Sequence, residues 1–364
     1  MEHIASFDRS IRVYGTAYEM GFQHGTILRN EIQALLRDAL VRVNLVRTTP
    51  ISLRSARDYA WSCGEWISKQ FPDLRDEING LSDGAGIDLV DAIVLQMRRE
   101  LSLLDETGIP VGLDCTTFAI RQNNQGLLAQ TVDLGGDVAD LARLFFVNPS
   151  DGRPAAVLYS FVGLLGYIGI NQYGLAVGIN MLLDGQATVG VPPYLISRAL
   201  LNLRNIDEAL ELLRKVHPAS ARAFVLSDTQ QSAIVELTSS SLSVYFDKTL
   251  FHTNHFVCEE LLGFERSDPF SLRLSKRRLD RIQLLVQKRQ QAGPLSMEDA
   301  LDVLSDHDQF PFSICSHRVG SDIKKPISVA AIAFDCTRRL LSIRPGYPCC
   351  TTSETFAVEG QTYI

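Results

Sequence analysis

The sequence predicts an α+β fold in which two sheets pack together and carry helices on their outer faces. Helical periodicity dominates up to about residue 105, strand-like runs begin at Cys115, and a helical block after residue 270 precedes the last strands. The 364 residues exceed the usual length of a single domain, and neither an internal repeat nor a low-complexity linker divides them. Two domains, or one large layered domain with an added lobe, are therefore expected.

The N-terminal part is expected to be helical, because apolar residues recur three and four positions apart in segments 18–43, 53–71 and 89–104. Pro110 and Gly112 end this pattern. Segments 116–121 and 127–132 then flank the turn Asn123-Asn124-Gln125-Gly126, which predicts a β-hairpin. Further strands are expected at 155–161, 175–181, 223–226, 233–237, 242–246, 328–334 and 340–343. Further helices are expected at 194–203, 206–216 (with Asn205 as its N-cap), 272–290 and 297–304.

The composition is ordinary for a soluble globular protein and argues against two kinds of partner. Apolar residues make up 46% of the chain and charged residues 21%, and the net charge is -7. Arg98-Arg99 and Lys276-Arg277-Arg278 are short basic clusters, which we expect on solvated helix faces, so a nucleic-acid partner is not expected. Apolar runs such as 327–334 are far shorter than the about 20 residues that cross a bilayer, so no membrane span is expected.

The seven cysteines indicate a reducing compartment. Their number is odd, and they are scattered without a CxxC pair or a disulfide framework. Residues 1–8 contain neither a basic region nor an apolar stretch, so a secretory signal is not expected. We therefore expect a cytoplasmic, enzyme-sized protein.

Cys115 is the first candidate catalytic residue. It opens the run Cys-Thr-Thr-Phe-Ala-Ile directly after Asp114, where helical sequence gives way to strand-like sequence. A buried core thiol is the simplest interpretation, because free cysteine behaves as a small hydrophobe. The alternative is that the chain is cleaved between Asp114 and Cys115. The new α-amine, with an unperturbed pKa of about 7.7 to 8.0, would then be the base for its own thiol.

The histidines allow two other kinds of site. His252 and His255 have a spacing that could bind zinc, but neither an HExxH sequence nor a cysteine pair accompanies them. A Cys/His dyad would pair Cys115 with His24, His252 or His255. A papain-like cysteine lies at a helix N-terminus, where its pKa is lowered, whereas Cys115 opens a strand. No metal ligands are therefore assigned, and no cofactor is expected because P-loop and dinucleotide-binding motifs are lacking.

Five segments, taken in order along the chain, resemble a known family. The sequence is similar to the self-cleaving N-terminal-nucleophile acyltransferases and hydrolases, the family that includes fungal isopenicillin N acyltransferase and insect β-alanyl-dopamine hydrolase. Each segment alone is a weak signal, but their order and spacing over most of the chain are specific. The segments are GTAYEMGFQHG (15–25), CTTFAI (115–120), GINQYGLAVGIN (169–180), HTNHF (252–256) and PFSIC (311–315).

The resemblance implies a four-layer αββα fold and autocatalytic cleavage before Cys115. Residues 1–114 would form a helical pro-segment, or α-chain, and residues 115–364 a catalytic β-chain that stays associated with it as a heterodimer. By matching position, Cys115 would be the nucleophile, Asp133 would orient the new amino terminus and its thiol, and Asn254 would donate a hydrogen bond to the oxyanion. Considered without the resemblance, Asp133 would be a strand-end turn residue and Asn254 a loop amide that bonds its own backbone.

The residues assigned to substrate binding are Asn180, Thr116 and Arg318. Asn180 and Thr116 would line the acyl site. The arginine that follows the Ser-Ile-Cys segment of the fungal enzyme is Ser316 here, and Arg318 would take its role. Asp114 stands where the fungal enzyme has a glycine. Cys315 is not expected to be catalytic, because its apolar neighbours predict burial and a buried thiol is inert.

The predicted function is that of an autoproteolytically activated N-terminal-cysteine amidohydrolase or acyltransferase. It would form an acyl-enzyme thioester with a small N-acylated molecule, and water or an amine would then accept the acyl group. The resemblance also implies acyl-CoA or another acyl thioester as a donor, so an acyl-CoA-dependent N-acyltransferase with little hydrolysis is an alternative. Two further alternatives are an inactive binding protein of the same fold and a metal-dependent hydrolase.

Overall fold

The computed structural model describes residues 9–45, 47–104, 115–135, 138–185, 187–310, 312–320 and 325–358. Within these ranges the strands form an eight-stranded and a six-stranded sheet. The larger sheet has the order β1 (Ser10–Gly15), β4 (Ala142–Pro149), β5 (Ala156–Phe161), β6 (Ile168–Asn171), β7 (Ala176–Met181), β8 (Arg222–Ser227), β9 (Ser232–Leu237) and β10 (Leu242–Phe246). Strand β1 pairs with β4 in parallel, and the other neighbours are antiparallel.

The smaller sheet is antiparallel and contains the hairpin that begins near Cys115. Its order is β11 (Thr249–His252), β2 (Thr117–Gln122), β3 (Gln125–Leu134), β12 (Ile327–Asp335), β13 (Leu340–Pro345) and β14 (Glu354–Ala357). The predicted hairpin of β2 and β3 is confirmed. Asn123 and Asn124 have φ values of 47° and 61°, the left-handed conformation that a two-residue hairpin turn requires and that asparagine tolerates.

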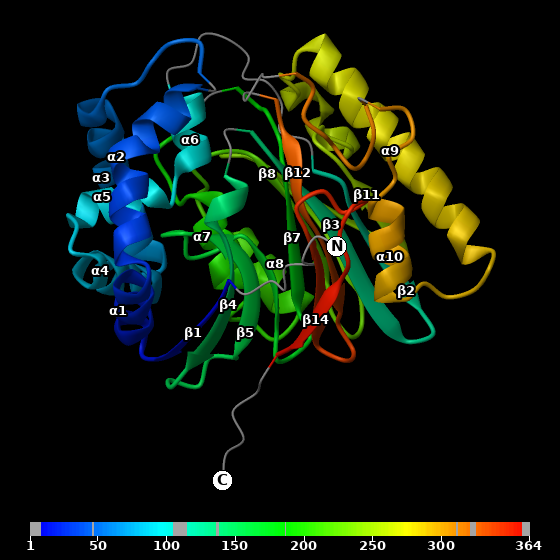
Figure 1. The fold of residues 1–364 in the computed structure, drawn as a ribbon, viewed down its shortest axis with the longest axis horizontal. Coiled ribbons are helices and arrows are strands. Elements are labelled where there is room, and N and C mark those ends of the chain that lie inside the picture. The colour runs from blue at the N-terminus through cyan, green and yellow to red at the C-terminus, as the bar shows by residue number, and fades with distance from the viewer. Residues whose placement is uncertain are drawn as a thin grey trace, which may run out of the picture.

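Helices lie on both sides of the paired sheets (Figure 1). The N-terminal part contributes α1 (Ala17–Ile27), α2 (Arg29–Leu45), α3 (Leu53–Gln70), α4 (Pro72–Ala85), α5 (Leu89–Leu95) and α6 (Arg98–Leu103). The later part of the chain contributes α7 (Pro193–Leu200), α8 (Ile206–Leu213), α9 (Pro269–Gln290) and α10 (Met297–Leu304). As predicted, the side chain of Asn205 caps α8 by accepting a hydrogen bond from the backbone N–H of Glu208.

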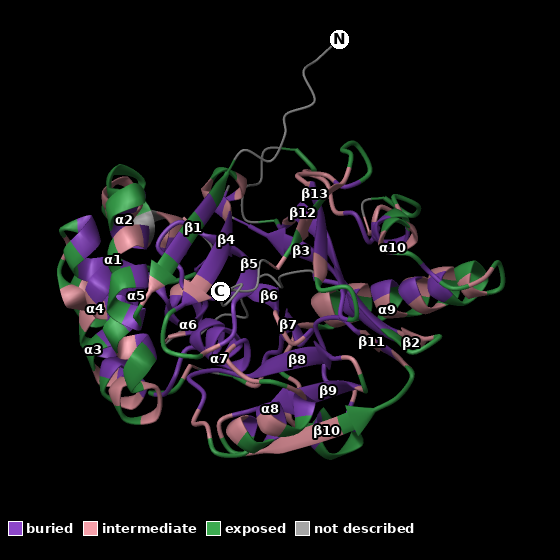
Figure 2. Ribbon diagram, turned by 90° about the horizontal axis from the view of Figure 1, so that it is seen from below, coloured by how far each residue is buried: buried purple, intermediate pink, exposed green. Residues whose placement is uncertain are grey.

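The layers follow from the contacts between elements. Strands β2 and β3 of the smaller sheet contact β7 and β8 of the larger one. Helices α7 and α8 contact the larger sheet, whereas α9 and α10 contact the smaller one. The α+β class and the four-layer αββα arrangement are thereby confirmed. In Figure 2 the central strands are buried, while α9 and the N-terminal helices present one buried and one exposed face, as amphipathic helices on a sheet should.

Several elements differ from the sequence prediction. The single helix expected at 18–43 is two helices that meet at Leu28, and α4 was not predicted. The N-terminal part also contributes a strand, because β1 pairs with β4 across a long stretch of intervening chain. The expectation of solvated faces holds for Lys276 and Arg277, which are exposed, but it is wrong for Arg99 in α6 and Arg278 in α9, which are buried.

The segment Glu19–Gly25, singled out in the sequence, has a packing role. Helix α1 crosses α4 so closely that a Cβ atom on Gly21 would lie 1.9 Å from the carbonyl oxygen of Glu77. A Cβ atom on Gly25 would lie 2.4 Å from the carbonyl oxygen of Leu81, also in the α4 backbone. His24, between them, accepts a hydrogen bond at Nε2 from the N–H of Gly163 at 3.2 Å, which ties α1 to the loop after β5.

As for membrane spans, the described part of the chain has no helix with the length and apolar character needed to cross a bilayer.

Candidate functional site

Cys115 lies between the two sheets, at the edge where β2 begins and where β3, β7 and β11 end. Thr116, the next residue, is already held by the hairpin, because its carbonyl accepts a hydrogen bond from Thr131 N at 2.9 Å. Asn180 reaches the same edge from the end of β7, and Asn254 follows the end of β11. The topology therefore brings together Cys115, Asn180 and Asn254, which the resemblance assigned to the site, from segments far apart in sequence.

Side-chain amides and an arginine hold the backbone of Cys115. Its N–H donates to Asn254 Oδ1 at 2.9 Å. Its carbonyl accepts from Arg278 Nη1 at 2.7 Å and from Asn180 Nδ2 at 3.3 Å. Arg278 also donates to Thr116 Oγ1 at 2.9 Å and to Asn254 Oδ1 at 3.0 Å. Both ends of the residue are fixed relative to the surrounding strands.

The thiol of Cys115 is buried, with the whole residue only 4% exposed. Its Sγ lies 4.0 Å from the carbonyl oxygen of Asp133, and the Tyr167 hydroxyl is close enough to affect its pKa. Burial raises the pKa of the thiol to about 12, and the charge of the Asp133 carboxylate acts in the same direction, while Arg278 opposes it. The thiol is therefore protonated at neutral pH and needs an adjacent base before it can act as a nucleophile.

Asp133 is fully buried at the end of β3. Its carboxylate accepts hydrogen bonds from Ser328 Oγ at 2.6 Å and from Thr131 Oγ1 at 3.0 Å. Thr131 Oγ1 in turn accepts from Thr116 N at 3.0 Å. Asp133 is thus connected to the residue after Cys115 through one hydroxyl group, which suits a residue that orients the nucleophile.

The amide group of Asn254 has a defined orientation. Its oxygen faces the nitrogen of Cys115, and its NH₂ group donates to the carbonyl oxygen of Met181 at 3.2 Å. The backbone N–H of Asn254 donates to Ser275 Oγ at 2.8 Å, which fixes the loop after β11 to α9. Asn254 is therefore beside Cys115, with its oxygen toward the peptide nitrogen and its donor group toward the end of β7.

The histidines considered for a dyad have their contacts elsewhere. His24 bonds Gly163, and its burial lowers its pKa to about 3. His252 Nε2 lies 3.0 Å from Glu236 Oε1. His255 Nδ1 lies 2.8 Å from Ser275 Oγ, and burial lowers the pKa of His255 to about 3 as well. These contacts support the packing of α1 and of the loop after β11, and they favour neither the dyad nor the zinc pair.

The sequence prediction missed Arg278 and Tyr167. Arg278 is 3% exposed, on the face of α9 that also buries Ser275, Ile282 and Val286. A charged residue within the buried stripe of an amphipathic helix is the signal that would have identified it. The predicted Arg318 lies half-buried in segment 312–320, where its backbone N–H donates to the Tyr347 hydroxyl at 3.4 Å. The arginine that contacts the Cys115 backbone is Arg278.

A mainly apolar cavity lies on the side of Cys115 where Tyr167 is found. Its volume is about 70 Å³, and Tyr167 forms part of its wall. Most of the other lining side chains are aliphatic and come from α2, α5, α6 and the strand ends near Leu134. The guanidinium groups of Arg42 and Arg98 also line it, and Arg98 Nη2 donates to the carbonyl of Gly135 at 2.7 Å. The site therefore combines a thiol, polar side chains that hold its backbone, and a nearby cavity with a mainly apolar wall.

The four layers and the buried cysteine at the start of a central strand are features of the N-terminal-nucleophile enzymes that the sequence resembles. Comparison with known families agrees: the model described as "AAT: Acyl-coenzyme A:6-aminopenicillanic acid acyl-transferase" matches residues 120–348, more than half of the chain. The chain belongs to this family, and hence to a family of acyltransferase and hydrolase enzymes.

Similar proteins span much of the chain at low identity. A relative from Emericella nidulans, "Acyl-coenzyme A:6-aminopenicillanic-acid-acyltransferase 40 kDa form", is 27% identical over 346 residues, which cover 92% of this chain and 91% of the relative. "Beta-alanyl-dopamine/carcinine hydrolase" from Drosophila melanogaster is 24% identical over 238 residues and 59% of each chain. Among solved structures, penicillin V acylase from Agrobacterium tumefaciens is 16% identical with a TM-score of 0.45, covering 66% of this chain and 85% of that one.

Proposed function

We propose that this protein is an N-terminal-cysteine amidohydrolase or acyltransferase that acts on small N-acylated molecules after cleavage between Asp114 and Cys115. The observation that carries the proposal is the convergence of Asn254, Asn180 and Arg278 on the backbone of a buried cysteine, near an apolar cavity that Tyr167 lines. A cysteine that only filled the core would not need these polar groups. Asp114 lies outside the described residues.

Cleavage would supply the base that the thiol needs. The peptide nitrogen of Cys115 would become a primary amine, and Asn254 Oδ1, now 2.9 Å from that nitrogen, would accept a hydrogen bond from it. With an unperturbed pKa of about 7.7 to 8.0, the amine is neutral in a large fraction of molecules near neutral pH. It would take the proton of Sγ as the sulfur attacks the substrate carbonyl, and return it to the leaving amine as the tetrahedral intermediate collapses.

Asn254 is also the proposed oxyanion donor. Its NH₂ group carries two hydrogens, and the bond to Met181 O uses one of them. The second hydrogen would stabilise the negative oxygen of the tetrahedral intermediate. Collapse of this intermediate leaves an acyl thioester on Cys115, which water would hydrolyse or an amine would aminolyse.

The cavity indicates the class of acyl group. Its wall is aliphatic and aromatic apart from Arg42 and Arg98, so an apolar acyl chain would lose the most water on binding there. An amide, acyl-CoA or another acyl thioester would deliver the same acyl group to Cys115. Helices α2, α5 and α6 precede the proposed cleavage point, so the cleaved pro-segment would remain part of the acyl site. All described cysteines are unpaired, which supports a cytoplasmic location.

The direct test is whether the purified protein consists of one chain or of two. We expect intact mass spectrometry to show two chains, residues 1–114 and 115–364, and N-terminal sequencing of the second to give Cys-Thr-Thr. Cys115→Ala should leave one uncut, inactive chain. Cys336→Ala, which removes another fully buried thiol at the far end of β12, is the matched control and should be cut and active. An active wild-type enzyme made of a single uncut chain would disprove the proposed mechanism.

A further inference from the structure

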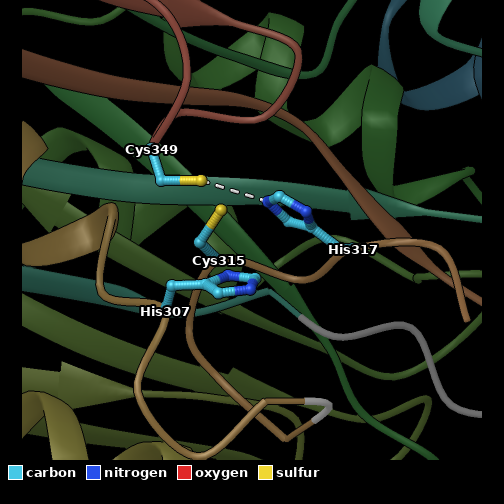
Figure 3. A group of neighbouring side chains, drawn as sticks. All are labelled: His307, Cys315, His317 and Cys349. Atoms are coloured by element: carbon cyan, nitrogen blue, oxygen red, sulfur yellow. Dashed lines mark hydrogen bonds between the residues drawn. The ribbon is translucent and has the colours of Figure 1, made fainter.

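A second group of reactive side chains lies outside the site around Cys115. His307, Cys315, His317 and Cys349 point toward one another in Figure 3. The nitrogen and sulfur atoms that could bind a metal all lie within 4.8 Å of one another. His307 follows α10, Cys315 and His317 belong to segment 312–320, and Cys349 lies between β13 and β14.

Two thiols and two imidazoles are a donor set that zinc prefers in structural sites. In a tetrahedral site with zinc–sulfur bonds of about 2.3 Å and zinc–nitrogen bonds of about 2.0–2.1 Å, neighbouring ligand atoms are about 3.3–3.8 Å apart. His317 Nε2 and Cys349 Sγ are already 3.1 Å apart, and the other separations need only small side-chain rotations. The four residues therefore match both the chemistry and the size of such a site.

We propose that His307, Cys315, His317 and Cys349 bind one Zn²⁺ ion in a structural site. Four protein ligands would complete a tetrahedral shell and leave no position for a reacting water, so the ion would hold the chain together and take no part in acyl transfer. The sequence analysis did not find these ligands because they come from three separate segments. It considered His252 and His255, which are closer in sequence and bond other groups.

The position of the group suggests what the ion would stabilise. Ser316, between two of the ligands, donates from its N–H to Ser328 Oγ at 2.8 Å, and its carbonyl accepts from Ser328 N at 2.8 Å. Ser328 Oγ in turn donates to Asp133 Oδ1 at 2.6 Å. A metal ion bound by Cys315 and His317 would fix the segment that positions this serine. The zinc site would thereby support the carboxylate beside the candidate nucleophile.

The test is metal binding by the full-length protein, measured without any enzyme assay. After removal of metal under reducing conditions, we expect one Zn²⁺ per chain on reconstitution. Co²⁺ in its place should give the thiolate-to-metal charge-transfer band and the intense visible bands of a tetrahedral site. His317→Gln and Cys349→Ser remove ligands from the outer side of the group, so the core remains packed. Each should weaken Zn²⁺ binding by more than about 100-fold, beyond the loss seen when only an outer-shell partner is removed.

Cys350→Ser is the matched control, because Cys350 is the neighbouring exposed cysteine, with Sγ 3.5 Å from that of Cys349, and is not one of the four ligands. It should bind Zn²⁺ as the wild type does. Three results would each overturn the proposal. They are less than one Zn²⁺ per chain in reconstituted wild-type protein, unchanged Zn²⁺ binding by Cys349→Ser, and a Cys315–Cys349 disulfide that persists under reducing conditions. The same measurements on Cys115→Ala make the result independent of cleavage and catalysis.

Discussion

The contacts of Arg278 show how the surroundings of one buried residue can distinguish a functional site from the hydrophobic core. Three of its hydrogen bonds go to neutral oxygens, on Cys115, Thr116 and Asn254. Burying a guanidinium group is costly unless its hydrogen bonds are satisfied, and these oxygens satisfy part of its hydrogen-bonding capacity. A fixed positive charge near the thiol favours its ionised form and opposes the effect of burial on the pKa of Cys115. This arrangement suits a cysteine that must become a thiolate during a reaction.

At the same scale, the variant Asn254→Ala should show whether Asn254 contributes to substrate binding or to the chemical step. An oxyanion donor acts on charge that develops in the transition state, so kcat should fall roughly 10²- to 10³-fold with little change in KM. The variant must first be shown to be cleaved, because Asn254 also holds the nitrogen of Cys115. Steady-state kinetics with any N-acyl substrate of the wild type give the answer.

His255→Gln is the control for that measurement. Its ring contacts Ser275, which holds the backbone of Asn254, so the substitution should cost far less than the loss of the Asn254 amide. If it were as damaging while folding and cleavage stayed intact, a Cys/His dyad would replace the amine as the explanation.

Among the elements, the crossing of α1 and α4 depends on glycine. Gly21 and Gly25 of α1 lie against the α4 backbone, and Gly80 and Gly84 of α4 lie against the α1 backbone. Gly21→Ala should lower the free energy of unfolding by about 1–3 kcal/mol, because the new methyl group would meet Glu77 O and force the helices apart. This is opposite in sign to the gain of about 1 kcal/mol that alanine brings in an isolated helix.

The control is Gly263→Ala, where a Cβ atom would have no neighbour within 4 Å. Its effect should stay within about 0.5 kcal/mol. Urea denaturation of both variants in the uncut Cys115→Ala background provides the comparison. Equal stabilities for the two variants would show that the helices separate without cost, contrary to the close packing described here.

The elements also show what sequence patterns can and cannot reveal. Helix α10 and strand β10 have the predicted bounds, because their apolar periodicity is regular and their ends carry clear signals. Strand β4 was missed because its apolar run is continuous, and such a run does not distinguish a strand from a buried helix. Strands β6 and β11 have only four residues each, too few for a periodicity to be seen.

Sequence patterns also fail to reveal which residues of the site contact one another, because these residues are far apart in sequence. Cys115, Asp133, Asn180 and Asn254 were identified through the resemblance, and the fold brings them to one edge of the paired sheets. Tyr167 carries no local signal, because only the packing of the loop between β5 and β6 places its hydroxyl against the thiol. Side chains that meet only through tertiary packing cannot be read from periodicity or spacing.

At the scale of the whole molecule, buried contacts that salt screens little connect the segments on the two sides of the proposed cleavage point. Strand β1 is hydrogen-bonded to β4, so backbone from both proposed chains forms one sheet. Two buried ion pairs also cross the junction: Glu77 with Arg198 at 3.2 Å and Glu100 with Arg222 at 3.3 Å. Since screening by salt acts mainly on exposed charges, high ionic strength should leave these contacts intact.

We therefore predict that the two chains stay together after cleavage and separate only when the protein unfolds. They should elute as one species in size-exclusion chromatography at low and at high salt, with activity retained. Glu100→Ala would leave the Arg222 guanidinium buried without its carboxylate, and should cost about 3–5 kcal/mol in stability. Asp58→Ala breaks the exposed pair with Arg54 and should cost no more than about 1 kcal/mol. Separation of the wild-type chains in salt alone would show that surface contacts hold the chains together, and equal losses in the two variants would contradict the expected importance of the buried pair. The acyl cavity would then be completed only transiently by α2, α5 and α6.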